Sequence, residues 1–372
     1  MTIPFIDLKT QYRAMEKEMR AAIEGVLAHG GFIMGPEIGR LEAELARFAG
    51  VKHALGCASG TDALLLPLMA LGVGPGDAVF TPTFTFIATA EVVSFLGATP
   101  VFVDSDPLTF NLDPDSLEKA LARVEAKGRL RPAGVIPVDL FGLPADYGRL
   151  EALARARGLF LLEDAAQGFG GRYHGRPAGS LGRAGATSFF PAKPLGCYGD
   201  GGAVFTDDDG LDEIMRSLRV HGQGENKYEN VRVGLNARMD TLQAAILLVK
   251  LAAFPAELEA RRRVAARYTR GLAGHVQTPA APDGLVSSWA QYSVLTDRRD
   301  AVMAALKQDG IPTAVYYPKP LHLQKAFAGL GYGPGDFPVA ESLSRRIFSL
   351  PMHPYLEDQT IDRIVERVIA AL

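Results

Sequence analysis

GVIPVDLFGLPADYGRLEALARARGLFLLEDAAQ, residues 134–167, contains two short apolar runs separated by a segment of helical period. The runs at 134–138 and 159–163 have the length and the β-branched or aromatic character of buried strands. Residues 145–158 between them repeat apolar side chains every three or four positions, as an amphipathic helix does. A strand, a helix and a second strand in this order predict a βαβ unit whose two strands lie parallel.

The same alternation extends in both directions from this unit. Further apolar runs that we predict to be strands lie at 53–57, 78–81, 99–103, 186–190 and 203–206. Helical patterns separate several of them, as in TDALLLPLMALG, FIATAEVVSFLG and LDPDSLEKALARV. Nearly all of the predicted strands are apolar on both faces, which is typical of a sheet covered by helices on both sides. The sequence therefore predicts an α/β fold with a mainly parallel, doubly wound sheet.

The chain of 372 residues is longer than a typical single domain of roughly 150 residues. A helical run, DTLQAAILLVKLAAF, follows a polar segment, and we expect Pro255 to end it because proline removes a helix hydrogen bond. We therefore expect an N-terminal segment at 1–30, a large domain at 31–254 and a smaller C-terminal α+β domain at 255–372. A helix at about 11–28 is expected to pack on the small domain or on a partner subunit.

Composition excludes several classes of partner. The chain has 39 basic and 42 acidic residues and a net charge of -3, so it lacks the positive field that nucleic acid or an anionic membrane requires. Neither a leader pattern nor an uninterrupted apolar run of roughly 18 residues is visible, so we predict no membrane span. The two cysteines suit a reducing cytoplasm, and the seven histidines lack metal-ligand spacing, so no metal is predicted.

Polar residues at the carboxyl ends of the predicted strands are the first candidates for chemistry, because ligands of doubly wound sheets bind there. Asp164 and Gln167 follow one strand in EDAAQ. A carboxylate at this point can hold a protonated ring nitrogen of a cofactor, or simply cap the next helix. Lys193 lies in SFFPAKPLGCYGDGGAVFT, residues 188–206, where prolines and glycines can hold its amine at a pocket. Taken alone, a loop lysine is usually a solvated charge.

Two further segments follow predicted strands. CASGTDALLL places Gly60 and Thr61 at a helix N-terminus, which suits a phosphate, although many helices begin with Ser-Gly-Thr as an ordinary cap. TPTFTFIAT offers Phe84 and Phe86, and by alternation only one of the two should face a pocket, where it can stack on a flat ring. The sequence alone does not choose between them.

In this order, GTDAL, TPTFTFIAT, EDAAQ and SFFPAKPLGCYGDGGAVFT resemble the DegT/DnrJ/EryC1/StrS sugar aminotransferases, which are fold type I pyridoxal-phosphate enzymes. The resemblance runs nearly end to end and includes FIDLKTQY, FIMGPEIGRLE, RVGLNARMDTLQAAIL, YYPKPLH and SLPMHPYL. It implies pyridoxal 5'-phosphate as cofactor, glutamate as amino donor with 2-oxoglutarate as its product, and a nucleotide-linked keto sugar as acceptor.

The resemblance also assigns roles to residues. Lys193 matches the lysine that binds the cofactor and moves protons, and Asp164 matches the partner of the pyridine nitrogen. Asn236 matches a residue that reaches the phosphate of the neighbouring subunit, which implies a homodimer with shared active sites. The remaining matched cofactor contacts are Gln167 near the ring hydroxyl, Phe86 on the ring face, and Gly60, Thr61 and Ser188 at the phosphate.

Within the family, SFFPAKPLGCYGDGGA and RVHGQ resemble most the aminotransferases of UDP-2-acetamido-2-deoxy-ribo-hexuluronate, which install a 3-amino group. A uronic acid needs a cation near its carboxylate, and Arg238, supplied across the dimer, is the candidate because guanidinium binds carboxylate through two hydrogen bonds. A purely structural interface role for Arg238 is equally open. His221 and Tyr317 match pocket-lining positions, although a lone histidine or tyrosine more often has a structural hydrogen bond.

Two alternatives remain at this point. One is 4-amination of a nucleotide-linked 4-keto-6-deoxy sugar, and the other is a non-catalytic regulatory protein that keeps the fold. One branch of the family replaces the lysine with histidine and removes a hydroxyl, and Lys193 argues for transamination instead.

Overall fold

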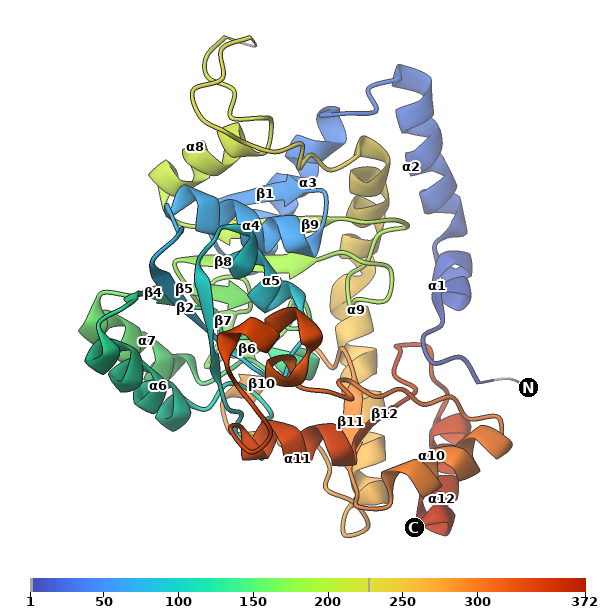
Figure 1. The fold of residues 1–372 in the computed structure, drawn as a ribbon. Helices are drawn as coiled ribbons and strands as arrows, with labels where there is room; N and C mark the ends of the chain where they lie inside the picture. The colour runs from blue at the N-terminus through green and yellow to red at the C-terminus, as the bar shows by residue number, and fades with distance from the viewer. Residues whose placement is uncertain (1–2, 227) are drawn as a thin grey trace.

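The computed structural model describes residues 3–226 and 228–372, which form an α/β protein around a seven-stranded sheet (Figure 1). The strands lie in the order β1-β9-β8-β5-β4-β2-β3, and β9 alone runs against its two neighbours. The prediction of an α/β fold with a mainly parallel sheet is therefore confirmed. The strands are β1 (His53–Cys57), β2 (Asp77–Pro82), β3 (Thr99–Val103), β4 (Arg131–Val135), β5 (Phe160–Asp164), β8 (Ala184–Ser188) and β9 (Gly202–Thr206).

Two strands begin and end earlier than the sequence predicts. β4 ends at Val135 instead of residue 138, since Pro137 has no N–H to donate to a ladder. An isolated bridge from Val138 to Asp164 continues the same parallel alignment. β8 ends at Ser188 instead of residue 190, and beyond it Phe189 is buried while Phe190 is exposed.

Helices cover both faces of the sheet. On one face, α4, α5 and α8 pack on apolar strand residues such as Val79, Leu162 and Val204. On the other face, α6 and α7 pack near β3, β4 and β5, and α3 packs beside β1. These helices are α3 (Pro36–Ala49), α4 (Gly60–Ala70), α5 (Ala88–Phe95), α6 (Pro114–Lys127), α7 (Tyr147–Arg157) and α8 (Asp209–Leu218).

The prediction that Pro255 ends a helix is wrong. α9 spans Thr241–Leu272 and contains Pro255 in its interior. Proline in a helix costs about 3 kcal/mol, but buried side chains on both sides of it, Phe254 and Leu258, are held in one core cluster. Tertiary packing therefore overrides the local preference. In Figure 1, α9 runs through the length of the molecule, from the sheet to the C-terminal elements.

α9 is also the one described helix that is long and apolar enough to cross a membrane by length and composition, with 56% of the relevant window buried inside the protein. Its first half packs in the cluster that contains Leu247 and Phe254, and its second half packs in another that contains Tyr268 and Leu272. Since its side chains serve these two protein cores, α9 is a core helix.

The N-terminal helix is two helices, because the chain leaves helical geometry at Met15. α1 (Leu8–Ala14) and α2 (Glu16–His29) both lie along α9 in Figure 1. Gln11 Nε2 donates to both carboxylate oxygens of Glu257 in α9, at 2.9 and 3.0 Å. The N-terminal segment of this chain thus packs on α9.

The C-terminal elements form a core of their own around the second half of α9. β11 (Tyr292–Leu295) and β12 (Ile347–Leu350) pair antiparallel, and α10 (Arg299–Gln308) and α12 (Asp358–Ala371) contribute Val302, Ile361 and Val365 to this cluster. Short elements complete the described chain: β6 (Arg172–Tyr173), β7 (Arg176–Pro177), β10 (Leu285–Val286), α11 (Pro338–Arg346) and the 3-10 turns Leu140–Gly142, Leu321–Leu323 and Lys325–Leu330.

Candidate active site

Asp164 and Ser188 are the last residues of β5 and β8, and Lys193 follows five residues after Ser188. β5 and β8 are parallel neighbours, so both strands end at the same edge of the sheet. Lys193 and Asp164 are close enough for each charge to change the pKa of the other. The sheet topology therefore brings together the two residues that the sequence singles out for chemistry.

The Asp164 carboxylate is buried and held on both oxygens. Thr89 donates its hydroxyl to Oδ2 at 2.8 Å, and the N–H of Ala166 donates to Oδ1 at 3.2 Å. Burial raises the pKa of Asp164, while these two hydrogen bonds and the charge of Lys193 lower it. Thr89 was not singled out from the sequence, although it lies in TPTFTFIAT at the carboxyl end of a strand, where such a residue was to be sought.

Lys193 lies in a tight loop that leaves its amine available. Its backbone N–H donates to the carbonyl of Phe190 at 2.9 Å, and a Cβ at Gly196 would meet that carbonyl oxygen at 2.5 Å. In the part of the chain that the structure describes, the Lys193 amine has no hydrogen bond or ion pair. Burial lowers its pKa, and the charge of Asp164 partly offsets this effect. At a given pH, a lysine with a lowered pKa is neutral more often than an ordinary lysine, and only a neutral amine can attack a carbonyl group.

Gln167 joins Asp164 to a segment far away in the sequence. Its Oε1 accepts a hydrogen bond from the N–H of Phe141 at 2.7 Å, and its Nε2 donates to the Tyr317 hydroxyl at 3.1 Å. Gln167 is buried and Tyr317 is half-buried, and burial raises the pKa of the Tyr317 hydroxyl. The hydrogen bond therefore places Tyr317 beside Gln167.

The structure also separates the two phenylalanines between which the alternation of residues did not choose, and of which the family resemblance favours Phe86. Phe84 is 1% exposed and packs in the core, whereas Phe86 is 55% exposed. Both rings contact Tyr317, with centroid distances of 6.2 Å for Phe84 and 6.3 Å for Phe86. Phe86 is therefore the ring that is free to stack on a ligand next to Tyr317.

The start of α4 meets the end of β8. Gly60 and Thr61 open this helix, and Ser59 caps it by accepting a hydrogen bond from the N–H of Asp62 at 3.1 Å. A Cβ on Gly60 would lie 2.6 Å from the Cβ of Ser188, so only glycine allows this approach. The first amides of a helix have no acceptor within the helix and favour an anion. Gly60, Thr61 and Ser188 thus form one group that suits a phosphate.

His221, Asn236 and Arg238 lie in the connection between α8 and α9. His221 and Asn236 are exposed, and Arg238 donates to Asn236 Oδ1 at 2.9 Å. Across residues 3–226 and 228–372, no hydrogen bond or ion pair joins these three residues to Lys193 or Asp164. The single chain does not bring them to that pair by such contacts, and their roles stay predictions.

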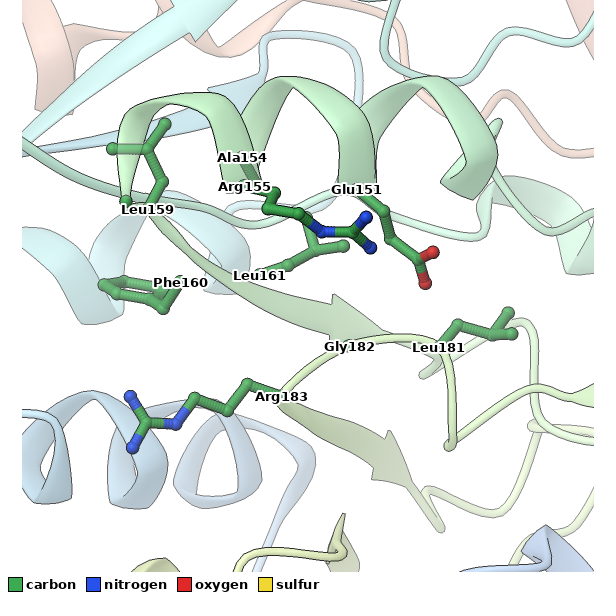
Figure 2. A pocket seen from close by; sticks show the side chains of 10 residues that line it. Glu151, Ala154, Arg155, Leu159, Phe160, Leu161, Leu181, Gly182 and Arg183 are labelled. Atoms are coloured by element: carbon green, nitrogen blue, oxygen red, sulfur yellow. The ribbon is translucent and has the colours of Figure 1, made fainter.

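A surface pocket lies at the other edge of the sheet and is not part of this group. Figure 2 shows it between α7 and the starts of β5 and β8, with Glu151, Arg155, Phe160 and Arg183 among its lining residues. Asp164 and Ser188 are at the opposite ends of the same strands. For metals, the described residues contain no group of three or more His, Cys, Asp or Glu side chains that could hold an ion.

Comparisons with known proteins give the family. The model of the DegT/DnrJ/EryC1/StrS aminotransferase family matches residues 13–369. The chain is 48% identical to the UDP-2-acetamido-2-deoxy-3-oxo-D-glucuronate aminotransferase of Pseudomonas aeruginosa, over 96% of this chain and 97% of that protein. The crystal structure of a DegT DnrJ EryC1 StrS aminotransferase from Brucella abortus superposes with a TM-score of 0.97 at 52% identity, covering 99% of each chain.

A sugar aminotransferase from Streptococcus pneumoniae, solved in a PMP-form, matches with a TM-score of 0.90 at 28% identity over 100% of this chain and 98% of that chain. PMP is the aminated form of pyridoxal phosphate, and the residues described above fit this cofactor. Lys193 offers an available amine of lowered pKa, Asp164 a buried carboxylate, and Phe86 an exposed ring. This chain is a pyridoxal-phosphate-dependent enzyme and belongs to the DegT/DnrJ/EryC1/StrS aminotransferase family.

Proposed function

We propose that this aminotransferase moves an amino group from glutamate to the 3-keto group of a UDP-linked N-acetylhexosaminuronic acid. The placement of Lys193 beside Asp164 at the carboxyl edge of the sheet carries the chemical part of this proposal. The relative from Pseudomonas aeruginosa, a UDP-2-acetamido-2-deoxy-3-oxo-D-glucuronate aminotransferase, supports this choice of sugar.

Pyridoxal phosphate, when bound, supplies an electron sink for the carbanion that forms next to the nitrogen. Asp164 would hold the ring nitrogen in its protonated form, because an ionised carboxylate stabilises a cation beside it. Gln167 would lie near the ring hydroxyl and Phe86 on the ring face. The phosphate would be bound by the Gly60 and Thr61 amides and by Ser188.

Lys193 would move the proton between the two carbon atoms that exchange it during transamination. A base must be neutral to accept a proton, and burial lowers the pKa of this amine toward the working pH. Its backbone N–H donates to the carbonyl of Phe190, two residues beyond the end of β8, and this bond limits how far the amine can move. Lys193 can then act as base and acid at one place in both half-reactions.

We propose a homodimer in which each subunit completes the site of the other. Exposed apolar side chains, which are rare in large groups on monomers, occur before α3 and in the connection between α8 and α9. Arg238 and Asn236 follow that connection and would reach the partner's site, Arg238 for the sugar carboxylate and Asn236 for the phosphate. The exposed residues are Phe32, Ile33, Met34, Val231 and Val233.

The experiment that tests the substrate compares two acceptors with the purified enzyme and glutamate. We expect turnover with the UDP-linked 3-keto uronic acid and little with a nucleotide-linked 4-keto-6-deoxy sugar, and the amino sugar formed is identified by mass spectrometry. Preference for the 4-keto sugar would replace the proposal with 4-amination. A protein that binds the cofactor but consumes no glutamate would instead favour a regulatory role.

A variant separates recognition of the uronic acid from chemistry. Arg238→Gln should raise KM for the uronic acid and leave the glutamate half-reaction unchanged, because only the sugar carboxylate needs the guanidinium. Arg232→Gln, at an exposed arginine of the same connection, serves as the matched control. An unchanged KM in Arg238→Gln would remove this residue from the proposal.

We place the reaction in the cytoplasm, where nucleotide sugars are made.

A further inference from the structure

Two fully buried carboxyl groups lie beside Asp164, and neither belongs to the cofactor contacts described above. Asp139 and Glu163 are both 0% exposed, and their side chains are close enough for a hydrogen bond between the two carboxyl groups. Two ionised carboxylates cannot form such a bond, because each of them only accepts. The contact therefore requires a proton on one of the two groups.

The surrounding donors decide which group carries this proton. Both oxygens of Glu163 already accept backbone N–H groups, from Gly179 at 2.7 Å and from Leu181 at 2.8 Å. Two such bonds stabilise the ionised form of Glu163. A proton on either of its oxygens would face one of these donors.

Asp139 has the opposite pattern on its two oxygens. Its Oδ1 accepts from the N–H of Ala145 at 3.1 Å and from the hydroxyl of Tyr147 at 2.9 Å. Its Oδ2 is buried and has no donor among the described residues. Oδ1 thus behaves as the carbonyl oxygen of a neutral acid, and Oδ2 as the oxygen that carries the hydrogen.

The charges around Asp139 and Glu163 also favour a proton on Asp139. Burial is the largest effect and raises the pKa of both acids, and the charge of Glu163 raises that of Asp139 further. The Tyr147 hydroxyl from α7 donates to Asp139, and the positive charge of Arg176 from β7 favours an ionised Glu163. An ionised Glu163 and a neutral Asp139 satisfy all of these groups.

Asp139 is also connected to the residues of the active site. Its backbone N–H donates to the carbonyl of Asp164 at 3.0 Å, and two residues later the N–H of Phe141 donates to Gln167. Gly168 lies so close that a Cβ there would meet Asp139 Oδ2 at 2.5 Å. The turn that begins at Asp139 therefore fixes where Asp164 and Gln167 lie.

We propose that Asp139 is a positioning residue that is protonated at neutral pH and donates its proton to ionised Glu163. The proton holds in place the turn whose backbone bonds to Asp164 and Gln167. This inference rests on the proposed role of Asp164 at the ring nitrogen.

The test compares substitutions that differ only in which group can donate. Asp139→Asn keeps a donor toward Glu163 and an acceptor at Oδ1, so it should retain the glutamate half-reaction within about threefold, whereas Asp139→Ala should lose about tenfold or more. Glu163→Gln turns an amide donor toward a backbone N–H, so it should lower both the rate and the melting temperature. Tolerance of Glu163→Gln with impairment of Asp139→Asn would place the proton on Glu163 and overturn the proposal.

A second readout does not depend on activity. The pKa of Asp139 is raised in the folded state above its ordinary value of 3.8, so folding takes up a proton and wild-type stability is lost as the pH rises. The free energy of unfolding of Asp139→Asn, measured by urea, should therefore gain on wild type from pH 5 to 8. A difference that does not change with pH would overturn the proposal. If wild type itself lacks the glutamate half-reaction, the proposed function fails, and the urea result still decides the proton.

Discussion

The hydroxyl of Thr89 donates a 2.8 Å hydrogen bond to the carboxylate of Asp164, so a helix that follows β2 controls an acid at the end of β5. This bond lowers the pKa of an acid whose burial raises it. The two residues are 75 positions apart in the sequence. The charge of Asp164 therefore depends on a contact that only folding creates.

Removing the hydroxyl of Thr89 should slow the glutamate half-reaction without changing the shape of the active site. Thr89→Val is nearly isosteric, and a lost hydrogen bond to a charged group costs about 1.5–3 kcal/mol, so we expect a loss of about tenfold or more in the glutamate half-reaction. Thr89→Ser keeps the hydroxyl and is the control. Equal rates for Thr89→Val and wild type, measured by stopped-flow absorbance, would mean that the bond does not support Asp164.

Lys193→Ala should abolish both the visible absorbance band of the bound cofactor and the consumption of glutamate, because its amine is the proposed attachment point and proton carrier. The control is Lys52→Ala, at an exposed lysine paired with Asp209 on the surface. Absorbance spectra and glutamate consumption are measured on both variants. Steady turnover in Lys193→Ala would contradict the assignment.

The loop that carries Lys193 should not tolerate a side chain at residue 196. A Cβ there would lie 2.5 Å from the Phe190 carbonyl oxygen and 2.7 Å from that of Pro191, which are backbone atoms and cannot move cheaply. Gly196→Ala should therefore displace the lysine and lower cofactor affinity, measured by titration with pyridoxal phosphate. Gly25→Ala, at a helical glycine with nothing within 4 Å, is expected to bind normally. Normal binding by both variants would count against this role of the loop.

Lys250 of α9 is 1% exposed and lies 5.2 Å from the Tyr198 ring centre, and burial lowers its pKa from 10.5 to about 8. The charged form is thus disfavoured in the folded state by about 3 kcal/mol, at about 1.4 kcal/mol for each pKa unit. Above pH 10.5 Lys250 is neutral in the folded and the unfolded state and does not lower the free energy of unfolding. As the pH falls from 10.5 through 8, the unfolded state takes up the proton first, and the folded protein loses stability. Lys250→Met should therefore gain stability on wild type as the pH is lowered from 10 to 7.

Urea unfolding at several pH values measures this difference. Lys9→Met, at an exposed lysine in α1, is the surface control. A difference between Lys250→Met and wild type that is constant across the range would mean that the lysine is not titrating in that window.

Local sequence patterns predicted the fold, with errors at the proline inside α9 and at the end of β4. Strands such as β1 and β3 have the predicted bounds, because their apolar runs end where the local signal ends. The prediction from Pro255 was wrong, because the burial of α9 side chains in two cores outweighs the free-energy cost of one proline in the helix. β4 ended early because Pro137 breaks the ladder, which the residue type could have indicated.

The site could be predicted where a residue follows a strand, and not where a partner comes from elsewhere in the chain. Asp164, Gln167 and Lys193 were chosen in this way, and their roles stay predictions. Thr89, which holds Asp164, and Tyr317, which accepts from Gln167, are joined to them only by the fold. Phe86 was separated from Phe84 by exposure, which the pattern of alternating residues could not provide.

The sequence by itself determined the α/β class, the order of most strands and helices and the candidate residues for the chemistry, because periodicity and residue type are local properties. Only the tertiary structure decided that Asp139 and Glu163 meet in a buried pair and that Thr89 reaches Asp164. Protonation and hydrogen bonding depend on burial and on neighbours brought from distant segments, and these exist only once the sheet has formed.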